Sequence, residues 1–388
     1  MYNRLFFYPL LIPLLLLIFS FSAISQNLPV KDLVVHEWAI FGTLHGSDGS
    51  QLSGLYAEDE TVPKFVYRHK LSDAIYNLFN QQEEQNLVEL KNVTLNIESS
   101  VTSFYSKTAK EVSVDVGFSY GLVNKWYPQC NSVDELPTEI DNINFSIPFN
   151  GLISWNNVQI LTPDSKIKFS SSNEQETETW INSRTTGANK IMVNNEIENF
   201  LFYSAIGNLT IPFQFNFSNN KELKIINSGE IDIPYLFVFE NTENGPNVWW
   251  TGGLKQNETV NISSTKSSYA FVDAKLKEFQ KALMKLGLYE NEVIAMFKTL
   301  ESSYFTKRGF RIFYILNPKE VALAIPINII PEPLEIKRVF IGKCDIFTPE
   351  IEQQLLLDYK TDYLLNKYRN NRYYLGMLQR ANNLKSNY

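Results

Sequence analysis

Apolar and polar residues alternate with a period of two through most of the first two thirds of this chain, and this pattern limits its fold more than any other feature. Clear runs cover residues 93–97, 112–118 and 209–217. Such alternation indicates strands with one buried and one solvent-facing side, as in antiparallel sheets. The sequence therefore predicts a mainly β, sandwich-like body that is α+β overall once its helical segments are included.

Several segments add helices and further strands to this body. The period changes to 3.6 over residues 271–305, which predicts a helical hairpin with Gly287 at its turn. Strands are expected again over residues 310–316, 321–329 and 338–347, and residues 71–85 are expected to be helical or irregular. Thr348 and Pro349 have the residue types of a helix start, so a last helix is expected from Pro349 to about Arg380.

The expected organisation has five parts. Residues 1–25 are a signal peptide, 26–270 a β-rich body, and 271–305 the helical hairpin. Residues 306–348 complete the body with strands, and 349–388 form the C-terminal helix and tail.

The first 25 residues have the pattern of a secretory signal peptide. Arg4 precedes an apolar run over residues 5–21, and Ala23 and Ser25 are small residues before a cleavage point at Gln26. We expect a cleaved segment and a periplasmic or extracellular protein. The alternative is an uncleaved N-terminal membrane anchor, because the run approaches the roughly 20 residues that span a bilayer. Contact with a membrane is expected only through this segment.

Charge and cysteine content exclude some partners and sites. The chain has 35 Lys and Arg against 42 Asp and Glu, a net charge of −7, and no clustered basic segment. Nucleic acid is therefore not an expected partner, since phosphate neutralisation needs grouped cations. Its two cysteines, Cys130 and Cys344, permit one disulfide or two free thiols, and they are too few for a zinc site built from cysteines alone.

The three histidines, His36, His45 and His69, all lie in the first 70 residues and are candidate metal ligands. The alternative is that they are hydrogen-bonded or exposed without a metal. His36 and Glu37 do not form the helical zinc-protease motif, because Ile40 stands where its second histidine is required. On a strand, these two neighbours point to opposite faces.

Other chemical signatures are weak. The sequence has no nucleophile elbow, phosphate-binding loop or dinucleotide fingerprint, so no cofactor is predicted, while a divalent metal stays open. Arg68, Arg184, Arg311 and Arg338 are candidates for buried salt bridges, with an anion site as the second interpretation. Trp249 and Trp250 suit an aromatic platform for sugars or a pair with one ring in the core.

The motif His36-Glu37-Trp38, followed by Phe41, Gly46, Asp48 and Gly49, resembles the start of a family of exported bacterial proteins with a His-Glu-Trp-Gly-Thr-Phe sequence. Here Ala39 and Ile40 replace the Gly-Thr of that pattern. Further similar segments occur through most of the chain, up to Thr348-Pro349-Glu350. The resemblance implies export and supplies no activity or catalytic residue. Two positions depart from the pattern: Lys125, where an acidic residue is usual, and Ser204, where an arginine is usual.

Two functions follow as hypotheses. The first is an exported, non-catalytic binding or envelope-associated protein whose partner is a polysaccharide, an envelope component or another protein. The alternative is a hydrolase or metal-dependent enzyme with a site near His36, Glu37, Arg68 and His69. Whether the chain is an enzyme stays open, with the balance toward a non-catalytic role.

Overall fold

The computed structural model describes residues 30–53, 62–69, 93–134, 145–149, 151–171, 176–219, 221–264, 266–361, 367–368, 371 and 373–386. The signal segment 1–25 and the segment 71–85, expected to be helical or irregular, lie outside the described residues. Within them, no helix is long and apolar enough to cross a bilayer.

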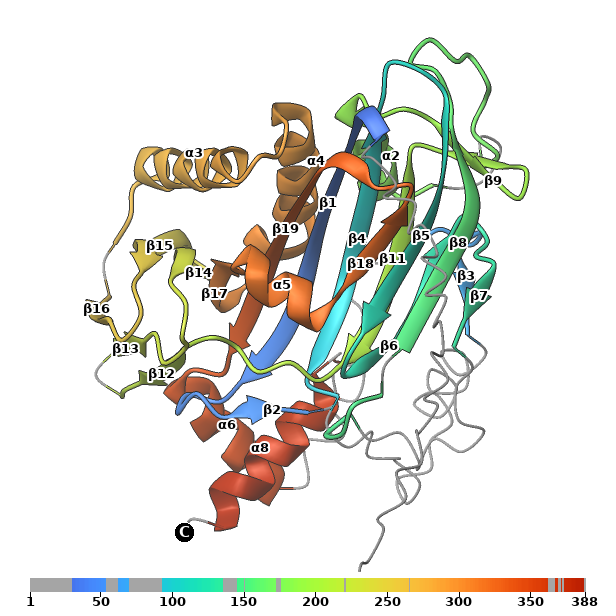
Figure 1. Ribbon diagram of the computed structural model, residues 1–388. Coiled ribbons are helices and arrows are strands. Elements are labelled where there is room, and N and C mark those ends of the chain that lie inside the picture. Colours follow the sequence, from blue (N-terminus) through green and yellow to red (C-terminus); the bar gives the residue numbers. More distant parts are fainter. Residues whose placement is uncertain are drawn as a thin grey trace, which may run out of the picture.

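The fold is mainly β with helices at its faces and C-terminal end, as the sequence predicts, and its largest sheet, sheet A, has ten strands (Figure 1). Their order is β15 (Gly245–Leu254), β14 (Ile233–Thr242), β17 (Gly309–Ile315), β19 (Pro333–Ile346), β1 (Val30–His45), β4 (Leu95–Tyr105), β11 (Phe200–Gly207), β6 (Gly121–Tyr127) and β3 (Tyr67–Arg68), with β2 (Gln51–Leu52) on β1.

Two smaller sheets complete the β structure. Sheet B has the order β10 (Glu196–Glu198), β9 (Ile191–Val193), β8 (Gly151–Ile160), β5 (Lys110–Phe118) and β18 (Ile327–Ile330), with β7 (Ser132–Val133) on β8. Sheet C consists of β12 (Gln214–Phe217), β13 (Glu222–Ile226) and β16 (Thr259–Ser263). Within the described residues, the strand pairs are antiparallel except for β1 with β19, which is parallel.

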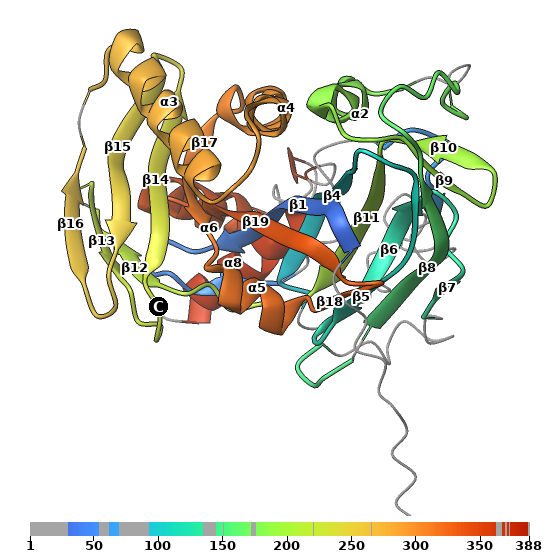
Figure 2. The ribbon, with the colours of Figure 1, turned by 45° about the horizontal axis from the view of Figure 1, so that its top comes forward.

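Sheet A is covered on both faces, so its central strand β1 is buried almost throughout. One face packs against sheets B and C in a core that includes Phe41, Tyr203 and Phe340. The other face packs against α3 (Tyr269–Lys285), α4 (Glu290–Leu300) and the π-helical turn η4 (Glu301–Phe305). Figure 2 shows α3 lying across the β14–β15 end of the sheet. A strand that is buried on both faces is expected to be mostly hydrophobic, so the polar residues of β1 need partners inside the protein.

Further helical segments lie elsewhere in the described part of the chain. The short helix α2 (Glu178–Ser183) and the 3₁₀ turn η3 (Arg184–Thr186) lie beside α4. The helices α6 (Pro349–Lys360) and α8 (Tyr374–Ser386) pack on the β1–β2 end of sheet A. As expected, the Thr348 side chain caps α6 by accepting a hydrogen bond from the backbone N–H of Ile351.

Three expectations about element bounds are wrong. The segment 321–329 is not one strand, because α5 (Pro318–Ala324) precedes β18; the side chain of Asn317 caps this helix and Pro318 occupies its first turn. The last helix does not continue to Arg380, since α6 ends at Lys360 and Arg380 belongs to α8. Strand β12 begins at Gln214, so the strand expected from residue 209 starts after Pro212.

Candidate functional site

His36 and Glu37 lie on opposite faces of β1, as the strand alternation predicts. The side chain of His36 faces α4 and is 1% exposed. Its Nδ1 lies 2.7 Å from Oε2 of Glu292, the third residue of α4. Glu292 also accepts hydrogen bonds from the Tyr105 hydroxyl at 2.8 Å and the Tyr289 backbone N–H at 2.7 Å. The pair therefore ties the start of α4 to the centre of sheet A.

Glu37 faces the core between sheets A and B and is fully buried. Its carboxylate accepts a hydrogen bond from the Tyr203 hydroxyl at 2.5 Å and forms an ion pair with Nε of Arg338. Arg338 also donates from Nη1 to the carbonyl of Ile325 at 2.5 Å. Burial and the neighbouring carboxylate raise the pKa of Tyr203 well above its usual value. The Glu37 carboxylate therefore joins β1 to β11 and β19.

Arg68 and His69 lie at the far edge of sheet A, in and just after β3. Four strand spacings separate β3 from β1, a distance of about 19 Å. Arg68 is exposed, and His69 is half-buried with its ring 5.0 Å from that of Trp126. Burial lowers the pKa of His69. The structure thus does not bring these two residues together with His36 and Glu37.

His45 is the last residue of β1 and lies nine residues and about 30 Å along the strand from His36. Its Nδ1–H donates to the carbonyl of Gly49 at 3.3 Å, and its Nε2 lies 3.0 Å from Oγ1 of Thr43. Burial lowers the pKa of His45 to about 4, against smaller opposing effects of Gly49 and two carboxylates. Among the described residues, no group of three potential metal ligands occurs.

The remaining sequence candidates have separate surroundings. Arg184 forms ion pairs with Glu198 at 2.6 Å and Glu176 at 2.5 Å, which is the buried salt-bridge alternative. Cys130 and Cys344 are both free thiols. Cys344 is buried in β19, and burial raises its pKa to about 12.

The tryptophan pair has one ring in the core and one nearer the surface. Trp249 is 7% exposed and donates from Nε1 to Glu240 at 3.1 Å, while Trp250 is half-buried. Lys125 and Ser204, the two positions that differ from the pattern that the sequence resembles, are cross-strand partners in β6 and β11. Both departures therefore occur at one place in the sheet.

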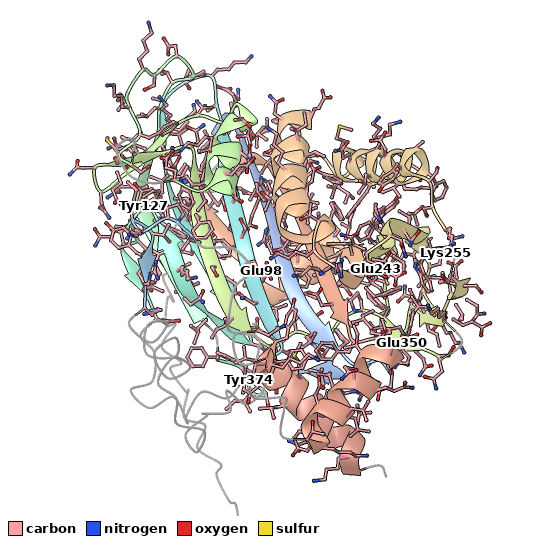
Figure 3. The ribbon with its side chains drawn as sticks, turned by 180° about the vertical axis from the view of Figure 1, so that it is seen from behind. Glu98, Tyr127, Glu243, Lys255, Glu350 and Tyr374 are labelled. Atoms are coloured by element: carbon pink, nitrogen blue, oxygen red, sulfur yellow. The ribbon has the colours of Figure 1, made fainter. Side chains whose placement is uncertain are left out.

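A buried charged cluster lies on the helix side of sheet A. Sequence reasoning proposes a buried salt bridge for Arg311, one of its members, but misses the others. Lys343, fully buried, has its Nζ 3.1 Å from Asp345 and 3.4 Å from Glu98, and Arg311 pairs with Asp345 at 2.8 Å. Tyr304 donates a hydrogen bond to Glu98, and Lys343 lies over its ring at 3.9 Å. Figure 3 shows Glu98 near the middle of this face. The available signal is the pair of charged residues, Lys343 and Asp345, on both sides of Cys344 in the otherwise apolar segment 339–346.

An open groove of about 730 Å³ lies where β1 ends, between the turn that follows β1 and the β12–β13 hairpin. This volume is within the range of about 300–1,000 Å³ found for small-ligand sites. Buried rings of His45, Phe213 and Phe215 contribute to its floor. The polar residues that line it are Ser50, Gln51, Thr210, Gln214, Asn216 and Ser228, with Asp48 and Lys224 as charged members.

Two of these residues occupy the polar positions of an alternating run. Gln214 and Asn216 are exposed, whereas Phe213, Phe215 and Phe217 between and beside them are buried. The sequence therefore contains the signal that Gln214 and Asn216 face solvent. It does not contain the information that they meet the end of β1.

Comparison with protein families and known structures assigns no function. The chain matches no family model. No curated protein matches it either. Two structures of the yeast δ-COP-I μ-homology domain, one of them complexed with a Dsl1 WxWxV peptide, each align with 82% of this chain and 98% of theirs. Both have 6% sequence identity and a TM-score of 0.29, values at which the likeness carries no inference about this chain.

Proposed function

We propose that this chain is an exported, non-catalytic protein that binds a polysaccharide segment in the groove at the end of β1. Export is inferred from the signal-peptide pattern of residues 1–25 and from the resemblance to exported bacterial proteins. A periplasmic or extracellular location gives access to envelope polysaccharides. The proposal therefore combines a compartment inferred from sequence with a site described by the structure.

The proposal rests on polar side chains that line the groove and have their hydrogen-bonding groups available for a ligand. Thr210, Gln214, Asn216 and Ser228 are exposed and make no side-chain hydrogen bond within the described part of the chain. Amide and hydroxyl groups donate and accept hydrogen bonds without a net charge. This is the chemistry that complements the hydroxyl groups of a sugar chain.

The charges of the groove support an uncharged ligand. Lys224 is its cationic member, and the carboxylate of Asp48 is already paired with Arg380 at 2.9 Å. A single lysine is a weak site for a polyanion, since phosphate binding uses several grouped cations. The open form of the groove also permits a ligand longer than the groove itself.

The hydrolase alternative receives less support from the geometry. Its four residues lie on two faces of β1 and at the distant β3 edge. His36 and Glu37 are each bound to a buried partner, Glu292 and Arg338. A shared cleft with a nucleophile or metal would need these groups to converge.

The proposal is tested by isothermal titration of the purified protein with a panel of neutral oligosaccharides: malto-, cello-, xylo- and chito-oligosaccharides. We expect at least one series to bind. Gln214→Ala and Asn216→Ala should each weaken that binding about threefold to tenfold, because each removes a hydrogen-bonding group worth about 0.5–1.5 kcal/mol.

The matched control is Asn261→Ala. Asn261 lies in the same cross-strand row of sheet C as Asn216 and Lys224, is exposed, and does not line the groove. Its replacement should leave the affinity unchanged. Equal losses in the Asn216 and Asn261 variants, or no binding across the panel, would contradict the proposal.

A further inference from the structure

One wall of the groove is the turn between β1 and β2, and the C-terminal helices hold this turn from its other side. Asp48, Gly49 and Ser50 line the groove. Arg380 of α8, only 5% exposed, donates from Nη1 to Asp48 at 2.9 Å and to the Ser50 hydroxyl at 3.1 Å. A residue far away in sequence thus holds two groove residues with one guanidinium group.

The second helix, α6, contributes through Glu352. Its carboxylate accepts hydrogen bonds from the backbone N–H of Ser47 at 2.8 Å and from the Ser47 hydroxyl at 2.6 Å. It also accepts from Nε of Arg380 at 2.6 Å. Glu352 therefore orients Arg380 and binds the turn directly. Charge-assisted hydrogen bonds of this kind are stronger than neutral ones.

Two glycines let the turn fit between α8 and sheet C. A Cβ on Gly46 would lie 2.6 Å from Cζ of Arg380, and one on Gly49 would lie 2.3 Å from the carbonyl oxygen of Phe215. On the same side, the Phe217 backbone N–H donates to the carbonyl of Ser47 at 2.7 Å. The turn is therefore in close contact with α8 on one side and with β12 on the other.

From these contacts we propose that Arg380 is a positioning residue of the groove, which fixes the turn against β12 and so makes ligand affinity depend on the C-terminal helices. This inference rests on the proposed function of the groove. Because Arg380 also neutralises Asp48, its loss leaves an unpaired carboxylate at the wall. Under this proposal, Gly46, Asp48 and Gly49 of the N-terminal motif shape the groove. They have no role in a site at His36 and Glu37.

The experiment compares Arg380→Gln with Arg308→Gln in the full chain. Arg308 is exposed. Its replacement by glutamine removes the same positive charge as Arg380→Gln does. Hydrogen exchange followed by mass spectrometry reports on residues 46–50 and 214–217, and titration with the oligosaccharide bound by the wild type reports on affinity. We expect Arg380→Gln to speed exchange at least tenfold in both segments and to raise the Kd about tenfold. Arg308→Gln should change neither.

Two further variants keep the test decisive if Arg380→Gln unfolds α8. Asp48→Asn removes one ion pair at a half-exposed residue, so it should fold and raise the Kd about threefold. Arg380→Lys should recover part of the affinity. The double variant Asp48→Asn with Arg380→Gln should bind about as weakly as Arg380→Gln alone, since both changes act on one contact.

The outcomes separate this inference from the function on which it rests. Unchanged exchange at residues 214–217 and a Kd within about twofold of the wild type in Asp48→Asn and Arg380→Gln would overturn the positioning role. Additive losses in the double variant would do the same. If the wild type bound no oligosaccharide, the proposed function would fail, whereas fast exchange in Arg380→Gln alone would still identify Arg380 as the residue that holds the turn.

Discussion

His36 and Glu37, adjacent in β1, are each joined to a partner more than two hundred residues away. The separations are 256 residues for His36 and Glu292 and 301 residues for Glu37 and Arg338. Removing one member of such a buried pair leaves a polar or charged group without a partner, which costs far more than the pair itself gains. His36 and Glu37 therefore have a structural role, which substitutions can test by their effect on stability.

We expect Glu37→Gln to destabilise the protein by about 3–5 kcal/mol, because Arg338 would remain buried without a counter-charge. The measurement is the free energy of unfolding from urea denaturation. Glu335→Gln is the matched control: Glu335 pairs with Lys337 of the same strand at 2.6 Å, but their side chains are 46% and 37% exposed. An exposed pair of this kind contributes at most about 1 kcal/mol. Similar losses in the two variants would refute the assignment of Glu37 as a buried anchor.

His45 should make stability depend on pH. Its pKa is about 4 in the folded protein, against an ordinary value of 6.5, because burial disfavours the charged ring. The unfolded chain therefore binds the proton first as the pH falls. The contribution of His45 is complete above about pH 6.5 and is lost between about pH 6.5 and 4, so stability should fall by about 2 kcal/mol from pH 7 to pH 5.

The pH effect is measured as the difference between the wild type and His45→Gln in urea denaturation at several pH values. The variant lacks the titrating ring, so its stability should vary less over this window. Parallel curves for the two proteins would mean that His45 is not buried in its neutral form.

At the scale of elements, the turn after β1 can be tested through its backbone. Gly49 and Gly187 have nearly equal φ angles, 81° and 82°, in the left-handed region. A Cβ on Gly187 would meet nothing within 4 Å, whereas one on Gly49 would meet Phe215. Gly187→Ala should therefore cost about 1 kcal/mol for its backbone alone, and Gly49→Ala about 1–3 kcal/mol more.

Thermal and urea unfolding of the two alanine variants give this difference directly. The backbone contribution is common to both variants. The additional loss of unfolding free energy in Gly49→Ala therefore measures how closely the turn packs on β12. Equal costs would show that the turn has room to move away from sheet C.

Local chemistry predicts some elements well and others poorly. The start of α6 follows from Thr348 and Pro349, whose capping and φ preferences act within one turn. The error at residues 321–329 has the opposite cause. A short apolar run suits both a buried helix and a strand, and here Asn317 and Pro318 start a helix before β18 begins.

The candidate site is less predictable than the fold. Alternation indicates that Gln214 and Asn216 face water and that His36 and Glu37 face opposite sides, because both conclusions need only the period of a strand. The groove, in contrast, requires β12 to lie against the turn at Asp48. The contact of Arg380 with Asp48 requires α8 to reach that turn as well. These are long-range placements set by packing of the whole chain, which local residue patterns do not encode.

At the scale of the whole molecule, sheets B and C, the helices α3 and α4, and the helices α6 and α8 all pack on sheet A. Its core toward sheets B and C includes residues from Leu33 to Ile346, so nearly the full length of the described chain contributes to one apolar interior. The groove, the turn and the C-terminal helices meet at one end of this sheet. The binding proposal and the positioning role of Arg380 thus concern the same end of the molecule.

The parallel pairing of β1 with β19 has a consequence for the order of folding. During synthesis β1 emerges near the start, whereas β19, which occupies the position beside it, emerges some 300 residues later. Until then β1, a 16-residue and largely apolar strand, has one edge without its partner. Open edges of this kind pair readily with other chains. The nascent protein therefore depends on its last third to close its central sheet, and shielding by a chaperone matters most in that interval.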